Sequence, residues 1–358
     1  MINWIDRLPP YSGAGLLLVA DGGATNCRVA ICSADGTLIG YHKAHGRPTN
    51  ARVIGEAAAG ENLVFTANAA MRSAGVSTAD IETCLITSAS VDTLARAASF
   101  DDALGAAGLA HAVRSTVPDT MGCWASTDSL GPAAAIIAGT GSVAVAADRE
   151  RRIWRRFGGW DFVLGDEGSG YALGRRALQE TLLVHEGRSE ASALAEAVVQ
   201  HWGGTDVEGL PDDVHYPTID KAWIASFAPI VTDLAAAGDL RALEIIDDEV
   251  TVLAEAALAA VAVLRGDERS GRTDAVPVGL FGGIAKDPVF QDRFRALMGE
   301  RSDVPLRFVI PEHSALVGAA ALAMIDRDPQ LRAEALDRLD AAVDVAVAAA
   351  DAAARGVR

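Results

Sequence analysis

Short apolar runs separated by polar or glycine-bearing turns open the sequence. Residues 16–20 form an apolar run with the length of a buried strand, and similar runs follow at 27–32 and 37–41. The pair Asp35-Gly36, between the second and third runs, is a strong hairpin signal. The pattern therefore predicts a strand, a tight polar turn, a second strand, a hairpin turn and a third strand.

The next part of the chain alternates helical spacing with strand-like runs. Apolar positions recur with a helical period over 51–75, and Gly75 stands where a helix C-cap would be. Runs at 81–87 and 113–117 predict two further strands. This order of elements predicts a largely parallel sheet with an antiparallel start.

The opening pattern then partly repeats. Residues 133–157 again contain three short apolar runs, with a glycine-bearing turn after the first, which suggests duplicated halves. We expect 168–265 to be mainly helical, 276–281 to be the last strand and 328–358 to be a final helix.

The overall composition limits the class of protein. The chain has 358 residues, enough for two domains, and 50% of them are apolar. Its net charge of −17 disfavours nucleic acid or an anionic membrane surface as a partner. No apolar run reaches the roughly 18 residues of a membrane span, and the first is too short for a signal peptide, so we expect a cytoplasmic protein. The four cysteines, none in a C-x-x-C pair, indicate neither a zinc site nor a redox site.

Two glycine-bearing turns, 21–25 and 139–142, follow the first strand of each predicted half. Their glycines let the backbone approach an anion, and the hydroxyl of Thr25 adds a donor. Asp21, at the end of the strand, can hold a hydrated Mg²⁺. Each turn alone is a weak signal, because Asp-Gly-Gly is also an ordinary hairpin. At matching places in two halves, they predict two phosphate loops that face each other across one cleft.

The segment 157–170 carries five glycines, Trp160 and three acidic residues, and it suits neither a core nor a helix. The face of a tryptophan can lie against the apolar side of a sugar ring, and carboxylates accept hydrogen bonds from its hydroxyls. We therefore interpret the segment as a sugar-binding loop. The alternative is an acidic surface loop with a buried tryptophan anchor.

Two weaker signals stand at other strand ends. Residues 280–285 form a glycine turn before a predicted helix from about Asp287, where adenosine can lie, although the turn is also typical of an ordinary strand-to-helix connection. Asp119 follows the strand 113–117 and can take the proton of an attacking hydroxyl. An aspartate before a threonine is, however, more often a helix N-cap.

Together, these motifs resemble the sugar kinase/heat-shock ATPase/actin superfamily. Within it they resemble the N-acetylglucosamine kinase and BadF/BadG/BcrA/BcrD-type ATPase family, over about residues 15–325. Residues 21–25 are similar to the family's first phosphate motif and 139–142 to its second. Residues 158–169 are similar to its distinctive signature G-G-W-G…G-D-E-G-S, and 280–285 to its adenosine motif.

The resemblance implies an α/β protein of two actin-like (ribonuclease H-like) domains, each a mixed five-stranded sheet flanked by helices, with a cleft between them. We expect the domains at 1–122 and 123–329, with a C-terminal helix at about 330–358 returning to the first domain. The resemblance also implies an ATP-dependent kinase, a phosphotransferase with an alcohol acceptor. It would use Mg²⁺, phosphorylate N-acetylglucosamine or glucosamine at the 6-hydroxyl, and form a homodimer.

The resemblance also implies roles for individual residues. Asp119 is the implied catalytic base, and Asp21 is the expected Mg²⁺ ligand. The implied ATP contacts are Gly22, Gly23, Thr25, Gly139, Thr140, Gly141, Gly282, Gly283 and Ala285. The implied sugar contacts are Asn50, Asp119, Gly159, Trp160 and Asp166.

Several positions depart from the family pattern. Ala24 and Asn26 alter the first phosphate loop, and residues 88–90 (Ser-Ala-Ser) stand where many members have a glycine-rich turn. Asp161 replaces the glycine that follows Trp160. Its carboxylate, near the sugar loop, can favour a free amine over an N-acetyl group.

Three other functions stay open at this point. An ATPase activator of a dehydratase needs cysteines that bridge an iron–sulfur cluster at a dimer interface, and here Cys84 and Cys123 are single and widely spaced. A repressor needs an N-terminal DNA-binding segment, for which residues 1–14 are too short. A non-catalytic sugar sensor would bind without turnover. The sequence leaves the substrate open among glucosamine, N-acetylglucosamine, N-acetylmuramic acid and glucose.

Overall fold

The computed structural model describes residues 2–10, 13, 15–128, 130–204, 206–216, 219–265, 274–311 and 314–355. The chain divides into two compact units. The first unit contains residues 1–133, 147–154 and 311–358, and the second contains 134–146 and 155–310.

A mixed five-stranded sheet forms the centre of the first unit, with the strand order β3-β2-β1-β4-β5. Strand β1 pairs antiparallel with β2 and parallel with β4, because a hairpin joins the first strands whereas helices join the later ones. The strands are β1 (Leu16–Gly22), β2 (Cys27–Cys32), β3 (Leu38–Ala44), β4 (Ile81–Ser88) and β5 (Val113–Pro118).

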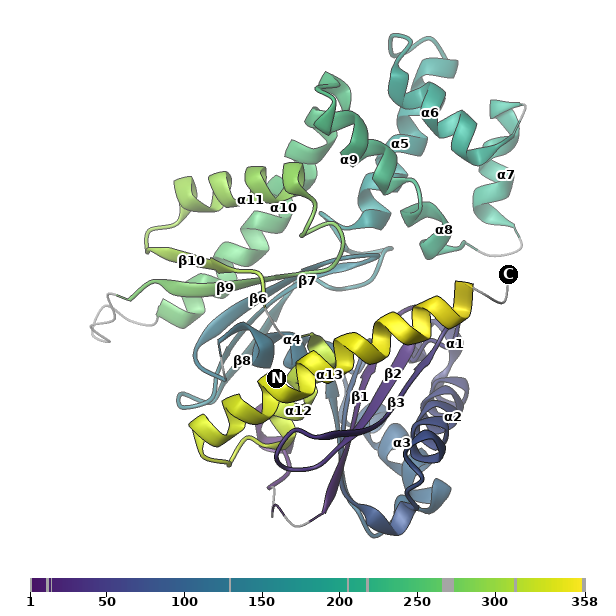
Figure 1. The fold of residues 1–358 in the computed structure, drawn as a ribbon. Coiled ribbons are helices and arrows are strands. Elements are labelled where there is room, and N and C mark those ends of the chain that lie inside the picture. Colours follow the sequence, from purple (N-terminus) through teal and green to yellow (C-terminus); the bar gives the residue numbers. More distant parts are fainter. Residues whose placement is uncertain are drawn as a thin grey trace. The chain divides into compact units, whose positions relative to one another are not determined.

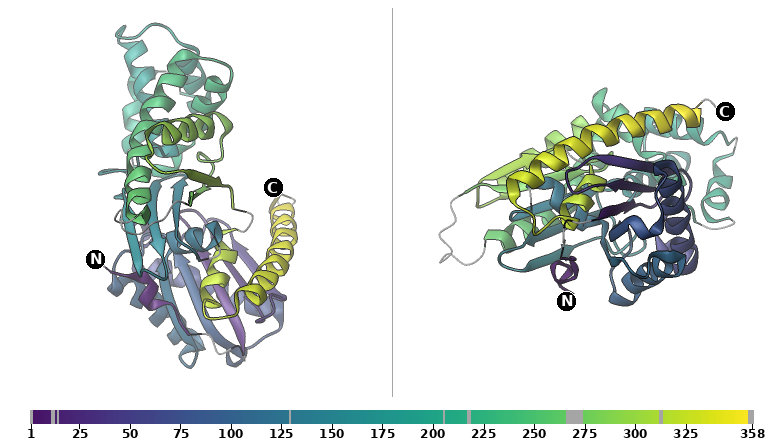
Figure 2. Two further views of the ribbon diagram at one scale, coloured as in Figure 1. Left: turned by 90° about the vertical axis from the view of Figure 1, so that its left-hand side faces the viewer. Right: turned by 60° about the horizontal axis from the view of Figure 1, so that its bottom comes forward.

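Helices cover both faces of this sheet (Figure 1). Helix α2 packs on β2 and β3, while α12 packs on β1 and β4 and α13 on β3. Figure 2 shows α13 (yellow) alongside the first strands (purple) from a second direction. The helices of this unit are α1 (Ala51–Ile54), α2 (Glu56–Ala74), α3 (Leu94–Leu104), α4 (Asp119–Thr127), α12 (Ala315–Ala323) and α13 (Pro329–Arg355), with short turns η1 (Trp4–Arg7), η2 (Thr78–Asp80) and η3 (Gly105–Leu109).

Two glycines shape the first unit. The helical character predicted for 51–75 is observed, and Gly55, with a φ of +84°, divides the segment into α1 and α2. Gly36, in the hairpin between β2 and β3, has a φ of +83°, and a Cβ on it would lie 1.9 Å from the carbonyl oxygen of Ala335. Glycine at this turn therefore lets α13 approach the sheet closely.

The second sheet has the strand order β10-β9-β6-β7-β8. Read from the other edge, this order is β8-β7-β6-β9-β10. When β6 to β10 are counted as first to fifth strand of their sheet, the order is the same as in the first sheet, as expected for duplicated halves. The prediction of two mixed five-stranded sheets in an α/β protein is confirmed. The strands are β6 (Ala133–Ala138), β7 (Ser142–Asp148), β8 (Ile153–Phe157), β9 (Val276–Phe281) and β10 (Leu306–Val309).

The prediction that 276–281 is the last strand is wrong, because β10 follows it. Strand β10 has only four residues, lies at the edge of the sheet and carries exposed Arg307, so it lacks the continuous apolar run of a buried strand.

The helices of the second unit follow β8, as the sequence predicts. Figure 1 shows α5 to α9 gathered beyond the strands of this unit. They are α5 (Gly170–His185), α6 (Ala193–Trp202), α7 (Leu210–His215), α8 (Lys221–Ala225), α9 (Ala228–Ala236), α10 (Leu240–Arg265) and α11 (Pro288–Arg301), with the short turn η4 (Val207–Gly209). None of the helices in the described ranges combines the length and the hydrophobicity needed to span a bilayer.

Candidate functional site

The polar turn between β1 and β2 has a fixed backbone. The N–H of Gly23 donates to the carbonyl of Asn26 at 2.9 Å, and the carbonyl of Gly23 accepts from the N–H of Thr49 at 3.1 Å. A Cβ on Gly22 would lie 1.9 Å from Thr49 Oγ1, so a side chain there would push the two segments apart. Thr25, a predicted phosphate contact, is exposed. The turn is therefore a preformed loop with an exposed hydroxyl, a suitable arrangement for binding an anion.

Asp119 begins α4 directly after β5. In the register of the parallel strands β1, β4 and β5, Asp21 is aligned with Thr87 and Val117. Asp21 and Asp119 therefore both lie at the carboxyl ends of these strands. The N–H of Thr120 donates to Asp119 Oδ1 at 2.8 Å. Burial, and then the negative charge of Asp21, raise the pKa of Asp119 to about 6. The carboxyl group therefore titrates close to neutral pH.

Asp21 is the predicted metal ligand, and it forms an ion pair with Arg28 on β2. Among the residues that the structure describes, no group of three or more His, Cys, Asp or Glu side chains could hold a metal ion. A Mg²⁺ that keeps several waters and binds nucleotide phosphates needs only one or two carboxylates. Asp21, with Asp119 nearby, fits such an ion, although Arg28 competes for the carboxylate. The residues do not fit a metal held by the protein alone.

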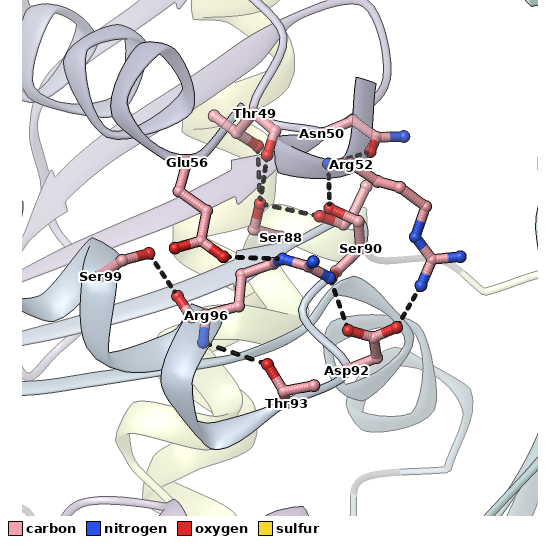
Figure 3. A network of polar contacts seen from close by, with 11 residues as sticks. Thr49, Asn50, Arg52, Glu56, Ser88, Ser90, Asp92, Thr93, Arg96 and Ser99 are labelled. Carbon is pink, nitrogen blue, oxygen red and sulfur yellow. Dashed lines mark hydrogen bonds and ion pairs between the residues drawn. The ribbon is translucent and has the colours of Figure 1, made fainter. Parts of the chain in front are cut away.

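A polar network joins the segment before α1 to the loop after β4 (Figure 3). The hydroxyl oxygens of Thr49 and Ser88 lie 2.7 Å apart, and both residues are buried. The N–H of Arg52 donates to Ser90 Oγ at 3.3 Å. Ser90 has a φ of +64°, which is uncommon for a residue other than glycine. The network thus holds Ser90 in a left-handed backbone conformation that favours glycine.

Two arginines anchor Asp92 at the end of this loop. Arg52 and Arg96 each form an ion pair with one oxygen of Asp92, and Arg96 Nη1 also donates to the carbonyl of Ser90 at 2.6 Å (Figure 3). Side-chain exposure of 33% for Arg52, 19% for Arg96 and 21% for Asp92 leaves these pairs partly shielded from solvent. Such pairs resist screening better than fully exposed ones.

Asn50, a predicted sugar contact, is the N-cap of α1. Its Oδ1 accepts from the N–H of Arg52 at 3.2 Å. Figure 3 shows its amide nitrogen pointing away from the network. The orientation fixed by the cap therefore leaves a hydrogen-bond donor to offer to a ligand.

In the second unit, residues 139–142 connect β6 with β7, and the start of α5 holds them. The N–H of Gly170 donates to the carbonyl of Gly139 at 2.7 Å, and the N–H of Tyr171 donates to the carbonyl of Thr140 at 3.2 Å. The first N–H groups of α5 therefore bind the loop itself, and the loop backbone is fixed by the helix terminus.

The turn after β9 lies against this loop. Gly282 has a φ of +93°, and a Cβ on it would lie 2.3 Å from the carbonyl oxygen of Ala138. The N–H groups of Ile284 and Ala285 donate to that same oxygen at 3.0 and 3.1 Å. A Cβ on Gly139 would lie 3.8 Å from Gly282 Cα. The structure thus brings two of the predicted ATP-binding segments together.

Trp160, in the predicted sugar loop, is 56% exposed. The guanidinium of Arg156 lies 4.2 Å from the centre of its ring, and Gly159 before it has a φ of +67°. Val163 and Leu164 in the same loop are also exposed. The alternative of a buried tryptophan anchor is therefore wrong, and the loop presents apolar side chains to solvent.

Asp166, a predicted sugar contact, is only 3% exposed. Its Oδ1 accepts from the N–H of Ser142 at 3.2 Å, and its Oδ2 accepts from Lys221 Nζ at 2.5 Å. Asp166 therefore links the sugar loop to the glycine loop 139–142. Both carboxylate oxygens of Asp166 already accept a hydrogen bond, so a sugar hydroxyl that donates to Asp166 would share one of them.

Lys221 is a residue that the sequence analysis did not identify. It begins α8 and lies 55 residues from Asp166 and 60 from Asp161, to which it donates a second bond at 3.0 Å. No glycine motif or strand end marks it in the sequence, so no local signal could have identified it.

The predicted site residues fall into two groups. The structure brings the members of each group together on loops at strand ends within one unit. The first unit holds Asp21, Gly22, Gly23, Thr25, Asn50 and Asp119, and the second holds Gly139, Thr140, Gly141, Gly159, Trp160, Asp166, Gly282, Gly283 and Ala285.

Two sheets with equivalent strand order, each followed at its first strand by a glycine-bearing turn, define an actin-like ATPase fold. The chain belongs to the BadF/BadG/BcrA/BcrD ATPase family, whose sequence profile matches residues 20–323. This confirms the family predicted from the motifs.

Individual relatives agree with this assignment. The chain is 31% identical over 129 residues to an N-acetylmuramic acid/N-acetylglucosamine kinase of Clostridium acetobutylicum, a match that covers 36% of this chain and only 42% of that relative. A structure from Chromobacterium violaceum, designated an N-acetylglucosamine kinase, is 25% identical with a TM-score of 0.69, covering 87% of this chain and 99% of the other. A second such structure, from Porphyromonas gingivalis, is 20% identical with a TM-score of 0.63, covering 88% and 99%, and shows the shared fold.

Proposed function

We propose that this chain is an ATP-dependent kinase that transfers the γ-phosphoryl group of ATP to the 6-hydroxyl of an amino sugar. The observation that carries the proposal is the position of Asp119 at a strand end beside Asp21, together with its raised pKa. Its pKa of about 6, at a strand end beside Asp21, suits a base that is ionised at neutral pH yet basic enough to accept a hydroxyl proton. Relatives named as sugar kinases support the same reaction.

In this mechanism Asp119 accepts the proton of the sugar hydroxyl. The hydroxyl oxygen forms a bond to the γ-phosphorus while the bond from that phosphorus to the bridging oxygen breaks, and ADP leaves. Mg²⁺ bound with the nucleotide would neutralise charge on the phosphates, with Asp21 as its protein ligand. Backbone N–H groups of the two glycine loops and the Thr25 hydroxyl would donate to phosphate oxygens.

The remaining predicted residues would orient the sugar. The amide of Asn50 offers a donor, and the exposed ring of Trp160 offers an apolar face for the sugar ring. The turn Gly282–Ala285, whose backbone is tied to Ala138, would receive the adenosine.

The experiment is a coupled assay of ADP release with purified protein, ATP and Mg²⁺. Four sugars are tested separately: glucosamine, N-acetylglucosamine, N-acetylmuramic acid and glucose. Phosphorus-coupled NMR of the product identifies which hydroxyl carries the phosphate. We expect strong stimulation by one amino sugar and a phosphate on the 6-oxygen. Sugar-independent hydrolysis would instead favour an activator ATPase, and sugar binding without turnover would favour a sensor.

The homodimer and the cytoplasmic location stay predictions. Light scattering after size-exclusion chromatography measures the mass of the assembly, and a value for one chain would contradict the dimer.

A further inference from the structure

Lys221 lies between the two predicted ligand loops of the second unit. Its Nζ donates to Asp161 Oδ1 at 3.0 Å and to Asp166 Oδ2 at 2.5 Å. The same nitrogen lies 2.9 Å from the position that a Cβ on Gly141 would occupy. One ammonium group therefore contacts the sugar loop twice and lies directly against the glycine loop.

The two carboxylates that it joins stand in uncommon backbone conformations. Asp161 has a φ of +73° and Asp166 a φ of +68°. Asp161 Oδ1 also accepts from the N–H of Phe162 at 2.9 Å, and Asp166 Oδ1 accepts from the N–H of Ser142. Each carboxylate is thus held by a backbone N–H and by Lys221, which fixes both turns of the loop.

This cluster is largely withdrawn from solvent. The side chains of Lys221, Asp161 and Asp166 are 18%, 19% and 4% exposed. Charge interactions at such positions are screened weakly. The carboxylate of Asp161, which the sequence suggests as a partner for a free amine, already has an ammonium as its counter-ion.

We propose that Lys221 is a positioning residue that also sets the charge preference of the sugar site. It holds Asp161 and Asp166 in place and occupies the position at which a protonated amine would be attracted. The site therefore takes the neutral N-acylated amino sugar and disfavours the cationic free amine. This inference rests on the proposed kinase function.

The test compares kcat/KM for N-acetylglucosamine and for glucosamine, at a pH where the amine is protonated. Lys221→Met leaves two carboxylates without their cation, so we expect the ratio to shift about tenfold or more towards glucosamine. Asp161→Asn leaves Lys221 with one carboxylate, so we expect a shift of about threefold or more in the opposite direction. Opposite shifts identify charge as the cause, because a purely structural role would move both variants the same way.

Two further variants serve as controls. Lys221→Arg keeps the cation and should keep the wild-type ratio within about threefold. Arg293→Met removes a cation from an exposed ion pair with Asp247 on α10, in the same unit, and should leave the ratio unchanged. Thermal unfolding of every variant identifies any that fails to fold.

The outcomes separate the inference from the function on which it rests. If the wild-type protein phosphorylates none of the amino sugars in the panel, the kinase proposal fails, and if it phosphorylates only N-acetylmuramic acid, the charge preference proposed for N-acetylglucosamine over glucosamine is wrong. If it phosphorylates N-acetylglucosamine and glucosamine but Lys221→Met and Asp161→Asn keep ratios within about twofold of wild type, or shift the same way, Lys221 has no role in charge preference.

Discussion

Asp119 and Asp21 are two neighbouring carboxylates with unequal surroundings. Asp21 has a counter-ion in Arg28, whereas Asp119 accepts from the N–H of Thr120 and has no ion pair among the residues that the structure describes. Burial, followed by the charge of Asp21, raises the pKa of Asp119 to about 6. These unequal surroundings agree with the proposed roles, proton transfer for Asp119 and electrostatic binding for Asp21.

Replacing Asp119 by Asn removes the proposed base. We expect kcat to fall by at least about 100-fold, because general base catalysis commonly contributes that much, with ATP affinity little changed. The measurement is steady-state kinetics together with nucleotide binding by calorimetry. Asp102→Asn, at an exposed position on α3, is the matched control and should keep normal turnover. Near-normal kcat in Asp119→Asn would remove this residue from the base role.

The pH dependence of kcat/KM should report the same group. A base must be unprotonated, so activity should decline as the pH falls below about 6, with a limiting slope of one proton. The measurement is the pH–rate profile with a saturable sugar substrate. A profile that stays flat down to the ordinary aspartate pKa of 3.8 would contradict the assignment.

The raised pKa of Asp119 also makes the free energy of unfolding depend on pH. Because the folded pKa lies above the ordinary value of 3.8, the folded state binds the proton more tightly than the unfolded state. The stabilisation from this group is fully present below about pH 4 and is lost as the pH rises through about 6. At pH 7 the Asn variant should therefore be more stable than wild type, by at most about 3 kcal/mol, and the gain should shrink at acid pH. Urea unfolding at several pH values measures it; equal stability at all pH values would contradict it.

Gly282 and Gly283 offer a test of the turn after β9. A Cβ on Gly282 would lie 2.3 Å from a carbonyl oxygen at a φ of +93°, whereas a Cβ on Gly283 meets nothing within 4 Å. Gly282→Ala should destabilise the protein by about 1–3 kcal/mol and weaken nucleotide binding. Gly283→Ala should change stability by less than about 1 kcal/mol. Thermal unfolding and ADP titration measure both, and equal effects would show that the turn does not depend on the left-handed glycine.

Asp92 tests the network that supports Asn50. Asp92→Asn removes two ion pairs that hold the loop after β4, so we expect KM for the sugar to rise about fivefold or more while KM for ATP stays within about twofold. Asp35→Asn, which breaks the exposed pair with Arg338 in the same unit, is the control and should change neither. An equal rise in both KM values would point to general loosening of the unit.

Much of the fold could be predicted because its signals are local. Asp35-Gly36 between two apolar runs predicts the hairpin of β2 and β3, and Gly75 predicts the end of α2, as observed. Asp287 is indeed the N-cap of α11. Strand β10 could not be predicted from an apolar run, because an edge strand of four residues need not have one.

The residues of the candidate site also differ in whether the sequence could predict them. Glycine loops and the Trp160 segment are contiguous in the sequence, so their composition alone points to ligand binding. Lys221 and Arg52 act through ion pairs with partners that are distant in sequence: Asp166 lies 55 positions from Lys221, and Asp92 lies 40 positions from Arg52. Only tertiary structure brings such partners together, and a single sequence contains no pattern that marks them.

Helix α13 has a consequence for synthesis on the ribosome. Asp351 on α13 pairs with Lys43 on β3, which is 308 positions earlier in the chain. Ala335 on α13 lies against Gly36 in the hairpin between β2 and β3. The second unit contains no residue beyond 310. The unit that emerges first is therefore the last to be completed. A nascent chain that pauses before residue 329 already contains every residue of the second unit, while its first sheet still waits for the helix that covers β3.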